Sequence, residues 1–412
     1  MTRKKRMQPR LFQSLLLCLL LSGVLMGCRK QVDVERITSY SGQSYSEVFE
    51  SFWKGMNENY MFWDIETVDW NNMYKTYKPR FESLDQQKGD PNAGPKAVQY
   101  LVDMTKDLSD SHLNLTFNGQ ATYLIEGYPI TSTGFNPASI RHQLRGDRAP
   151  IPRSVFDSVI PQHYLTKAEF GTDANDAFEI NLGIIPRSGK NILYIEFSQF
   201  MLNQEYWAEN STSTPVKPVL DDFFRYTKDP SIDGLIIDLR GNPGGSVPDL
   251  DFFLGSLITT PMQMAFTRTK NGDGALDYTP WIKGYVHPQP GSTDFTGKPV
   301  AVLVDGNSVS MSEMTSMTAK AIFPKAKLVG EQTWGGTGQI PADDVRYLGG
   351  QFTAGNFVQV YMAGVEMRDI NMVCHENKGF TPDIPVVYDT TAIKSNIDVM
   401  LDKAIQHVMT TN

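Results

Sequence analysis

The residue with the clearest chemical potential is Ser310, where a strand pattern changes into a helix pattern. Residues 300–304 are a short apolar run with β-branched side chains, typical of a buried strand. Turn-forming residues follow at 305–308, and the periodicity is helical from Ser310 to Ile322. A strand, a tight turn and a helix lift one side chain above a sheet edge and place backbone N–H groups beside it. Ser310 is therefore a candidate nucleophile.

The same serines also fit a purely structural role at the start of that helix. Ser308, Ser310 and Ser312 are all good N-cap residues, and Glu313 would complete a capping box with Ser310. Because capping serines are much commoner than nucleophilic ones, spacing alone leaves both interpretations open.

His112 is the histidine best placed to act as a base. It follows Ser109, Asp110 and Ser111 where a helical segment gives way to an alternating strand pattern. Neighbouring hydroxyl and carboxylate groups can orient an imidazole, although a single histidine at a loop is more often a surface or hydrogen-bonded residue. The other five histidines show no pair at the spacing of metal ligands, so we expect no metal site.

A glycine-rich turn at residues 240–246 follows the buried strand pattern of residues 231–239. Such a turn frees backbone N–H groups to face an anion. It lacks the Gly-Lys-Ser/Thr ending of a phosphate loop and the spaced glycines of a dinucleotide site, so we expect no nucleotide and no other cofactor. A tight turn that simply needs small residues is the alternative.

Three ordered motifs stand out in the second half of the chain. They are Asp-Leu-Arg-Gly-Asn-Pro-Gly-Gly at 238–245, Ser-Val-Ser-Met-Ser-Glu at 308–313 and Leu-Val-Gly-Glu-Gln-Thr-Trp at 328–334. Together they resemble the carboxyl-terminal-processing and tricorn family of serine peptidases, the tail-specific proteases. The resemblance covers residues 190–390 and extends to the helical segment that ends at His112. It implies an α/β (α+β) peptidase core of the crotonase-like type with an N-terminal helical domain.

The resemblance also implies roles for individual residues. Ser310 occupies the nucleophile position, and the backbone N–H groups of Gly244 and Met311 would form the oxyanion hole. The tail-processing branch takes a lysine base from the turn after the third motif. Here Gly336 stands at that position, and no lysine occurs between residues 327 and 378, so we do not expect a Ser–Lys dyad.

The tricorn branch instead uses a Ser-His pair and a late glutamate. Ser111-His112 is similar to that pair, and Glu376 looks like the glutamate. In this scheme His112 takes the proton of the Ser310 hydroxyl and returns it to the leaving amine. Glu376 would hold the imidazole tautomer with Ser111 assisting, and Asp110 is the substitute for Glu376.

The N-terminal residues resemble a bacterial lipoprotein signal. Five basic residues precede an apolar run at 11–26, and Leu25-Met26-Gly27-Cys28 closes it. The run is short for a membrane span, which needs roughly twenty residues. We expect a signal peptide over residues 1–27 and a lipid on Cys28, with ordinary secretion and an unmodified Cys28 as the alternative. The protein would then belong to the envelope of a Gram-negative bacterium, facing the periplasm or on the outer membrane.

Charge and cysteine content limit the remaining possibilities. The formal charge of −8 becomes about −13 when the five basic residues of the signal peptide are removed, and an acidic chain without a basic stripe argues against nucleic acid as a partner. Cys374 is the single cysteine after Cys28. Because it cannot form an intrachain disulfide with itself, a packed core must hold the fold.

Apolar periodicity organises the rest of the chain. A helical period recurs over residues 44–81 and 95–108 and again at 219–226, and a strand pattern covers 191–200. We expect a signal peptide (1–27), a tether (28–43), a helical domain ending in the Ser-His motif (44–117), a loop-rich β subdomain or insertion (118–189) and a catalytic α/β core (190–412).

The resulting hypothesis is a lipid-anchored serine peptidase that acts on a peptide or protein. One alternative is a catalytically inactive peptide-binding lipoprotein, because fold does not imply function. Another is an esterase or amidase, because Ser-His chemistry serves any acyl group. The sequence sets neither the cleavage rule nor the oligomeric state.

Overall fold

The computed structural model describes residues 39–40, 42–87, 89–173, 177–208, 216–340 and 350–411. The expected signal peptide, Cys28 and most of the expected tether lie outside these residues. The described residues form one compact unit. Within them, no helix has the length and apolar content needed to cross a membrane.

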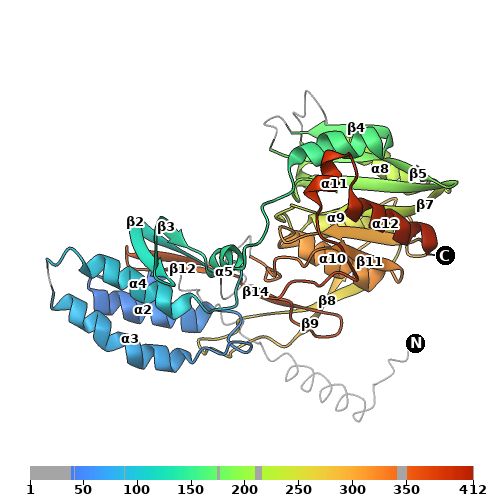
Figure 1. The fold of residues 1–412 in the computed structure, drawn as a ribbon. Coiled ribbons are helices and arrows are strands. Elements are labelled where there is room, and N and C mark those ends of the chain that lie inside the picture. Colours follow the sequence, from blue (N-terminus) through green and yellow to red (C-terminus); the bar gives the residue numbers. More distant parts are fainter. Residues whose placement is uncertain are drawn as a thin grey trace, which may run out of the picture. The chain divides into compact units, whose positions relative to one another are not determined.

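Three helices lie near the start of the described chain, after the short strand β1 (Ser39–Tyr40), as the periodicity predicted (Figure 1). They are α2 (Tyr45–Asn59), α3 (Trp70–Asp85) and α4 (Ala93–Thr105). Ser44 begins α2 with a capping box that includes Glu47, and the Asp69 side chain caps α3 by accepting from the Asn72 N–H. Their apolar faces form one buried core with the sheet described next.

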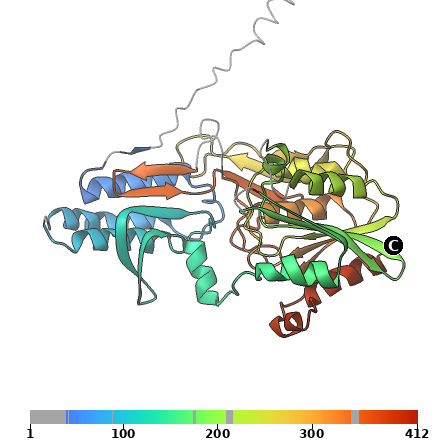
Figure 2. The same ribbon diagram turned by 90° about the horizontal axis from the view of Figure 1, so that it is seen from above.

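The helices share that core with a five-stranded sheet of order β1-β12-β13-β2-β3. Its strands are β1 (Ser39–Tyr40), β2 (Asn114–Ile125), β3 (Tyr128–Phe135), β12 (Gln351–Ala354) and β13 (Val358–Tyr361). Val360 of β13 pairs with Leu115 of β2, and Phe352 of β12 packs on Phe52 of α2. Figure 2 shows the orange strands beside the blue helix. The sequence analysis did not predict this pairing, because no local period reveals a partner so far along the chain.

The second sheet has seven strands in the order β15-β11-β10-β7-β6-β5-β4. They are β4 (Thr166–Thr172), β5 (Glu179–Arg187), β6 (Lys190–Phe197), β7 (Ile232–Asp238), β10 (Val300–Val304), β11 (Ala326–Gly330) and β15 (Ile384–Pro385). The neighbouring strands β6, β7, β10, β11 and β15 pair in parallel. Strand β5 pairs antiparallel with both β6 and β4. The strands predicted near residues 191, 231 and 300 are therefore confirmed.

Helices cover both faces of this sheet, so its parallel strands are apolar on both sides. Val302 and Val304 of β10 belong to the core formed with α8 (Val216–Tyr226) and α10 (Met311–Ile322). Ala301 and Leu303, which point the other way, belong to the core formed with α12 (Val399–Thr410). The helices predicted at 219–226 and 310–322 correspond to α8 and α10.

Shorter elements complete the described chain. The helical ones are α5 (Pro137–Arg145), the π-helical turn η1 (Val155–Val159), α6 (Ile160–His163), α7 (Leu202–Trp207), α9 (Asp249–Phe253), the 3₁₀ turn η2 (Leu254–Leu257) and α11 (Thr390–Lys394). A third sheet of order β14-β8-β9 contains β8 (Met262–Thr269), β9 (Ile282–Val286) and β14 (Val365–Asp369).

Candidate active site

Three motif-bearing loops leave the same edge of the seven-stranded sheet. Strands β7, β10 and β11 are parallel neighbours, and they lead into Gly244, Ser310 and Gly336 respectively. In an open α/β sheet, ligands bind beyond the carboxyl ends of such strands. The fold thus assembles motifs that the sequence keeps well apart.

Ser310 is the residue at which β10 has turned into α10. Its backbone has φ 56° and ψ −113°, a region that a non-glycine residue occupies only under strain. Its N–H donates to Glu313 Oε2 at 3.2 Å. An ordinary N-cap serine has an extended backbone instead. The strain therefore favours the nucleophile interpretation of Ser310 over that of a simple cap.

The glycine-rich turn packs directly against this junction. Gly244 has φ 100°, and a Cβ on it would lie 2.8 Å from both the Ser310 Cβ and the Met311 nitrogen. Met311 is the first residue of α10, so its N–H has no acceptor within the helix. The Gly244 N–H, in contrast, donates to Asn242 Oδ1 at 2.9 Å. Of the two expected oxyanion donors, Met311 is therefore the more readily available.

His112 lies beside the turn that follows β11. A Cβ on Gly336 would stand 3.3 Å from the His112 Cε1, 3.4 Å from a Val309 methyl and 3.5 Å from the Ser111 Cβ. Because Val309 immediately precedes Ser310, the imidazole lies in the surroundings of the strained serine. It occupies the space that a side chain at position 336 would enter.

The environment of His112 keeps its ring neutral. Burial lowers the pKa of His112 to about 4, so the imidazole is uncharged at neutral pH and able to accept a proton. Its Nδ1 is buried without a hydrogen-bond partner among the described residues. A neutral imidazole with an unbonded ring nitrogen can accept a proton, which a general base requires.

The carboxylates of Glu376 and Asp110 accept hydrogen bonds from backbone N–H groups around His112. Among the described residues, neither of them bonds its ring. Glu376 Oε1 accepts from the Ser111 N–H at 2.8 Å, and Oε2 accepts from the Thr337 and Gly338 N–H groups at 2.7 Å. Asp110 Oδ1 accepts from the His112 N–H at 2.8 Å. Burial raises the pKa of both carboxyl groups, and the charge of Asp110 adds to the rise at Glu376.

Ligand atoms of Asp110, His112 and Glu376 lie within 4.8 Å of one another. A metal would need their lone pairs, yet the carboxylate oxygens of Asp110 and Glu376 accept backbone N–H groups. That arrangement favours positioning over metal binding. Ser111 serves the same purpose, because its hydroxyl donates to the Gly335 carbonyl at 2.7 Å.

Sequence reasoning missed the central role of Glu313, which it treated only as part of a helix cap. Besides Ser310, this buried carboxylate accepts from Thr333 Oγ1 at 2.6 Å, from the Gly335 N–H at 2.8 Å and from the Gly336 N–H at 2.6 Å. Burial raises the pKa of Glu313 to about 7. One side chain thus joins the strained serine to the turn beside His112.

Replacing Glu313 by glutamine is expected to destabilise the fold by about 3 kcal/mol, because an amide keeps one acceptor and turns N–H donors toward backbone N–H groups. Urea unfolding followed by tryptophan fluorescence measures the change. The exposed Glu82→Gln variant is the matched control and should unfold like the wild type. Equal stabilities of the two variants would show that the hydrogen bonds to Glu313 do not stabilise the fold.

His142 supports the same turn from α5. Its ring stacks on Trp334 at a centroid distance of 3.5 Å, and its Nε2 lies 3.1 Å from the Trp334 carbonyl oxygen. The sequence analysis found no metal-ligand partner for His142 and gave it no other role. No local pattern indicated a contact between residues so distant in the chain.

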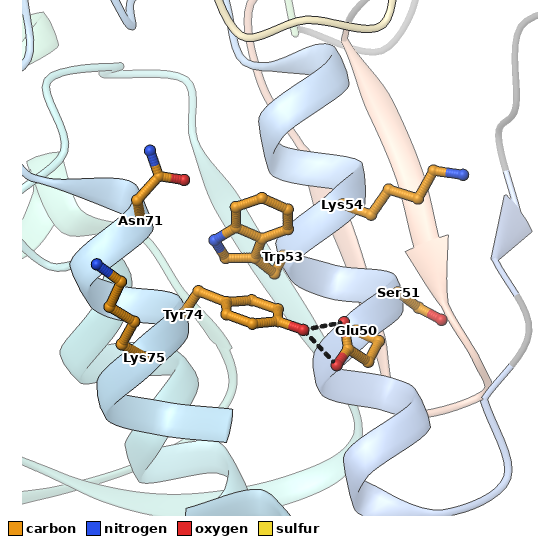
Figure 3. Close-up of a pocket in the computed structure, with 7 residues that line it drawn as sticks. All are labelled: Glu50, Ser51, Trp53, Lys54, Asn71, Tyr74 and Lys75. Carbon is orange, nitrogen blue, oxygen red and sulfur yellow. Dashed lines mark hydrogen bonds between the residues drawn. The ribbon is translucent and has the colours of Figure 1, made fainter. Parts of the chain in front are cut away.

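A separate cavity of about 650 Å³ lies between α2 and α3 (Figure 3). The Tyr74 hydroxyl points across it to Glu50, donating to Oε1 at 2.8 Å. Its lining consists of Glu50, Ser51, Trp53, Lys54, Asn71, Tyr74 and Lys75. None of the expected catalytic residues is among them, so we place the chemistry at the edge of the seven-stranded sheet.

Solved structures share this fold. A putative peptidase from Parabacteroides merdae ATCC 43184 matches with a TM-score of 0.62 at 20% identity, over 90% of this chain and 98% of that one. Mature CPAF matches with a TM-score of 0.54 at 13% identity, over 85% and 94%. Mature CPAF complexed with lactacystin matches with a TM-score of 0.53 at 12% identity, over 88% and 97%.

Family models add what structural likeness at these identities cannot. No curated protein sequence is similar enough to count as a match. Residues 191–386 match Peptidase family S41, and residues 41–88 match the Tricorn protease C1 domain. The Tricorn C1 match lies in the predicted helical segment, and the S41 match contains the three motifs that follow it in the chain. The chain therefore belongs to peptidase family S41, the tail-specific protease family of serine peptidases.

Proposed function

We propose that this protein cleaves peptide bonds with Ser310 as nucleophile and His112 as general base. The observation that carries the proposal is the neutral His112 imidazole, which lies in front of Gly336 together with Val309, the residue before the strained Ser310. A side chain at position 336 would have to compete with it for that space. The base is thus supplied from the segment before β2.

The proposed reaction follows from these positions. His112 takes the proton of the Ser310 hydroxyl as the oxygen attacks the substrate carbonyl, and then gives it to the leaving amine. The Met311 N–H donates to the oxyanion and stabilises it. The Gly244 N–H donates to the oxyanion as well, while it keeps its bond to Asn242 Oδ1. Water then hydrolyses the acyl-enzyme with His112 acting again as base and acid.

The carboxylates of Glu376 and Asp110 act on His112 in two ways, by their charge and by hydrogen bonds to the backbone around it. When they are ionised, Glu376 and Asp110 favour the imidazolium that forms during the reaction, and their hydrogen bonds hold residues 110–112 in place. Ser111 contributes by fixing the same segment to Gly335. A protein that binds peptides without catalysis does not need a strained serine, so the strained backbone of Ser310 favours an enzyme.

We further propose that a lipid on Cys28 ties the enzyme to the bacterial envelope, on the strength of the N-terminal sequence pattern alone. Its partners would then be peptide or protein substrates in the periplasm or at the outer membrane, and not nucleic acid. Loss of the lipid in a Cys28→Ala variant expressed in its host, seen by mass spectrometry and membrane fractionation, tests the anchor separately from the chemistry.

Fluorophosphonate labelling of the purified chain without residues 1–27 tests the catalytic proposal. We expect one modified residue, Ser310, and no modification in the His112→Ala variant, because an unassisted hydroxyl reacts poorly. Lactacystin, which mature CPAF binds, is a second probe for the same serine. Labelled Ser310 with hydrolysis of simple esters but no cleavage of peptides would indicate an esterase. No labelling would indicate the inactive peptide-binding protein.

A further inference from the structure

The segment that carries His112 belongs to no helix or strand. Residues 106–113 lie between α4 and β2, and the four successive N–H groups of residues 109–112 donate to side chains. Two of the accepting side chains belong to the site described above. The other two are Tyr60 and Glu66, which lie at the end of α2 and in the connection to α3. Side chains, and not a ladder of backbone bonds, therefore decide where this segment lies.

The Tyr60 hydroxyl joins the segment to Glu66. It accepts from the Asp110 N–H at 3.0 Å and donates to Glu66 Oε1. Tyr60 is fully buried, and burial raises its pKa well above the ordinary value, so the hydroxyl keeps the proton that it donates. Because Tyr60 is part of the buried core of the helical domain, the Asp110 backbone is fixed to that core.

Glu66 holds the residue before Asp110. Its Oε1 also accepts from the Ser109 N–H at 2.7 Å, and its Oε2 accepts from the Ser109 hydroxyl at 3.2 Å. Burial raises the pKa of Glu66, while the bonds from Tyr60 and Ser109 and the charge of Arg141 oppose that rise and favour the carboxylate. One carboxylate thus binds both the Tyr60 hydroxyl and the Ser109 backbone.

We infer that Tyr60 and Glu66 are positioning residues for the proposed base, because their bonds to residues 109 and 110 set where the His112 ring lies. Asp110 Oδ1 accepts from the His112 N–H at 2.8 Å, so a shift of Asp110 moves the peptide that carries the imidazole. A catalytic group must be held to within about half an ångström of its productive position. The inference rests on the proposed function, and it makes the helical domain a part of the catalytic apparatus.

Tyr60→Phe tests the inference, because it removes the hydroxyl and keeps the buried ring. We expect fluorophosphonate labelling of Ser310 to slow about threefold to tenfold, the effect of one lost hydrogen bond. The fraction of molecules finally labelled should stay at the wild-type value, whereas partial unfolding would lower it. In casein hydrolysis, kcat per labelled molecule should fall by the same factor with KM unchanged. Glu66→Ala, which also frees Ser109, should slow labelling at least as much.

Tyr164→Phe is the matched control. The Tyr164 hydroxyl is buried too, and it accepts from the Asp398 N–H at 2.7 Å at the start of α12. This variant loses the same kind of bond but should label at the wild-type rate. Hydrogen exchange followed by mass spectrometry locates each loss. Exchange should quicken about threefold to tenfold in the peptide containing Asp110 for Tyr60→Phe, and in the peptide containing Asp398 for Tyr164→Phe.

The outcomes separate this inference from the catalytic proposal. If the wild type is labelled and Tyr60→Phe or Glu66→Ala is labelled just as fast, the positioning role of that residue is overturned. Equal slowing in Tyr60→Phe and Tyr164→Phe overturns it as well, because any lost buried bond would then have the same effect. Slow labelling of Tyr60→Phe with unchanged exchange at Asp110 contradicts the route through the backbone. No labelling of the wild type sinks the catalytic proposal itself, and the inference falls with it.

Discussion

Replacing Ser310 by alanine is expected to lower the rate of casein hydrolysis by about 10⁶-fold, and His112→Ala by a similar factor. The double variant should be no slower than either single one. A nucleophile and its base act as one unit, because the hydroxyl does not attack without the base and the base has no proton to take without the hydroxyl. Initial rates of release of labelled casein fragments measure all three variants.

The control for His112 is His287, whose side chain is 57% exposed and, among the described residues, bonds to Asp251 alone. His287→Ala should cleave casein at the wild-type rate. Circular dichroism establishes that every variant is folded. Independent, multiplying losses from the two single changes would show that Ser310 and His112 do not work together, and activity in pure Ser310→Ala would remove the nucleophile assignment altogether.

Elements with strong local patterns were predictable from the sequence. The apolar run at Val300–Val304 is strand β10, and the periodic segment after Ser310 is helix α10. Strands β7 and β10 are parallel neighbours, so the glycine-rich turn and Ser310 leave the same end of the sheet, but the sequence did not reveal that adjacency. The sequence could also place His112 at the end of a helical segment.

The detailed geometry was not predictable, because it depends on contacts between distant residues. Glu313 reads as a capping residue three positions after Ser310, and only the fold brings the 333–336 turn onto its carboxylate. Glu376 was expected to hold the imidazole, yet its nearest bonds are to backbone N–H groups of Ser111, Thr337 and Gly338. The hydrogen bond from the Gly244 N–H to Asn242 likewise could not be predicted from the spacing of residues in the sequence. The catalytic roles of these residues stay predictions.

Two chain segments must therefore be held in register for the site to work. The proposed base comes from the segment between α4 and β2, and the proposed nucleophile from the start of α10. The bonds from Ser111 to Gly335 and to Glu376 join the first segment to the turn after β11, and Glu313 joins that turn to Ser310. The turn at 333–338 is thus the common support of the proposed nucleophile and the proposed base. A small change in this turn should move the base without touching either reacting group.

Gly336→Ala is expected to slow fluorophosphonate labelling of Ser310 by about tenfold. The added methyl group would stand 3.3 Å from the His112 Cε1, with Val309 and Ser111 closing the space on other sides. The imidazole must give way by a few tenths of an ångström. Since a displacement of about an ångström can cost a hundredfold in rate, this smaller shift should cost about tenfold. The backbone at Gly336 is not in the left-handed region, so alanine itself adds no backbone strain.

Two comparisons isolate the displaced imidazole as the cause. Gly297→Ala places a methyl group where nothing lies within 4 Å, so it should label at the wild-type rate. In a His112→Ala background, Gly336→Ala should cause no further loss, because no ring is left to displace. If Gly336→Ala labels as fast as the wild type, the space in front of Gly336 does not confine the base. If it slows His112→Ala as well, the methyl group acts on Ser310 through Val309 and not through the imidazole.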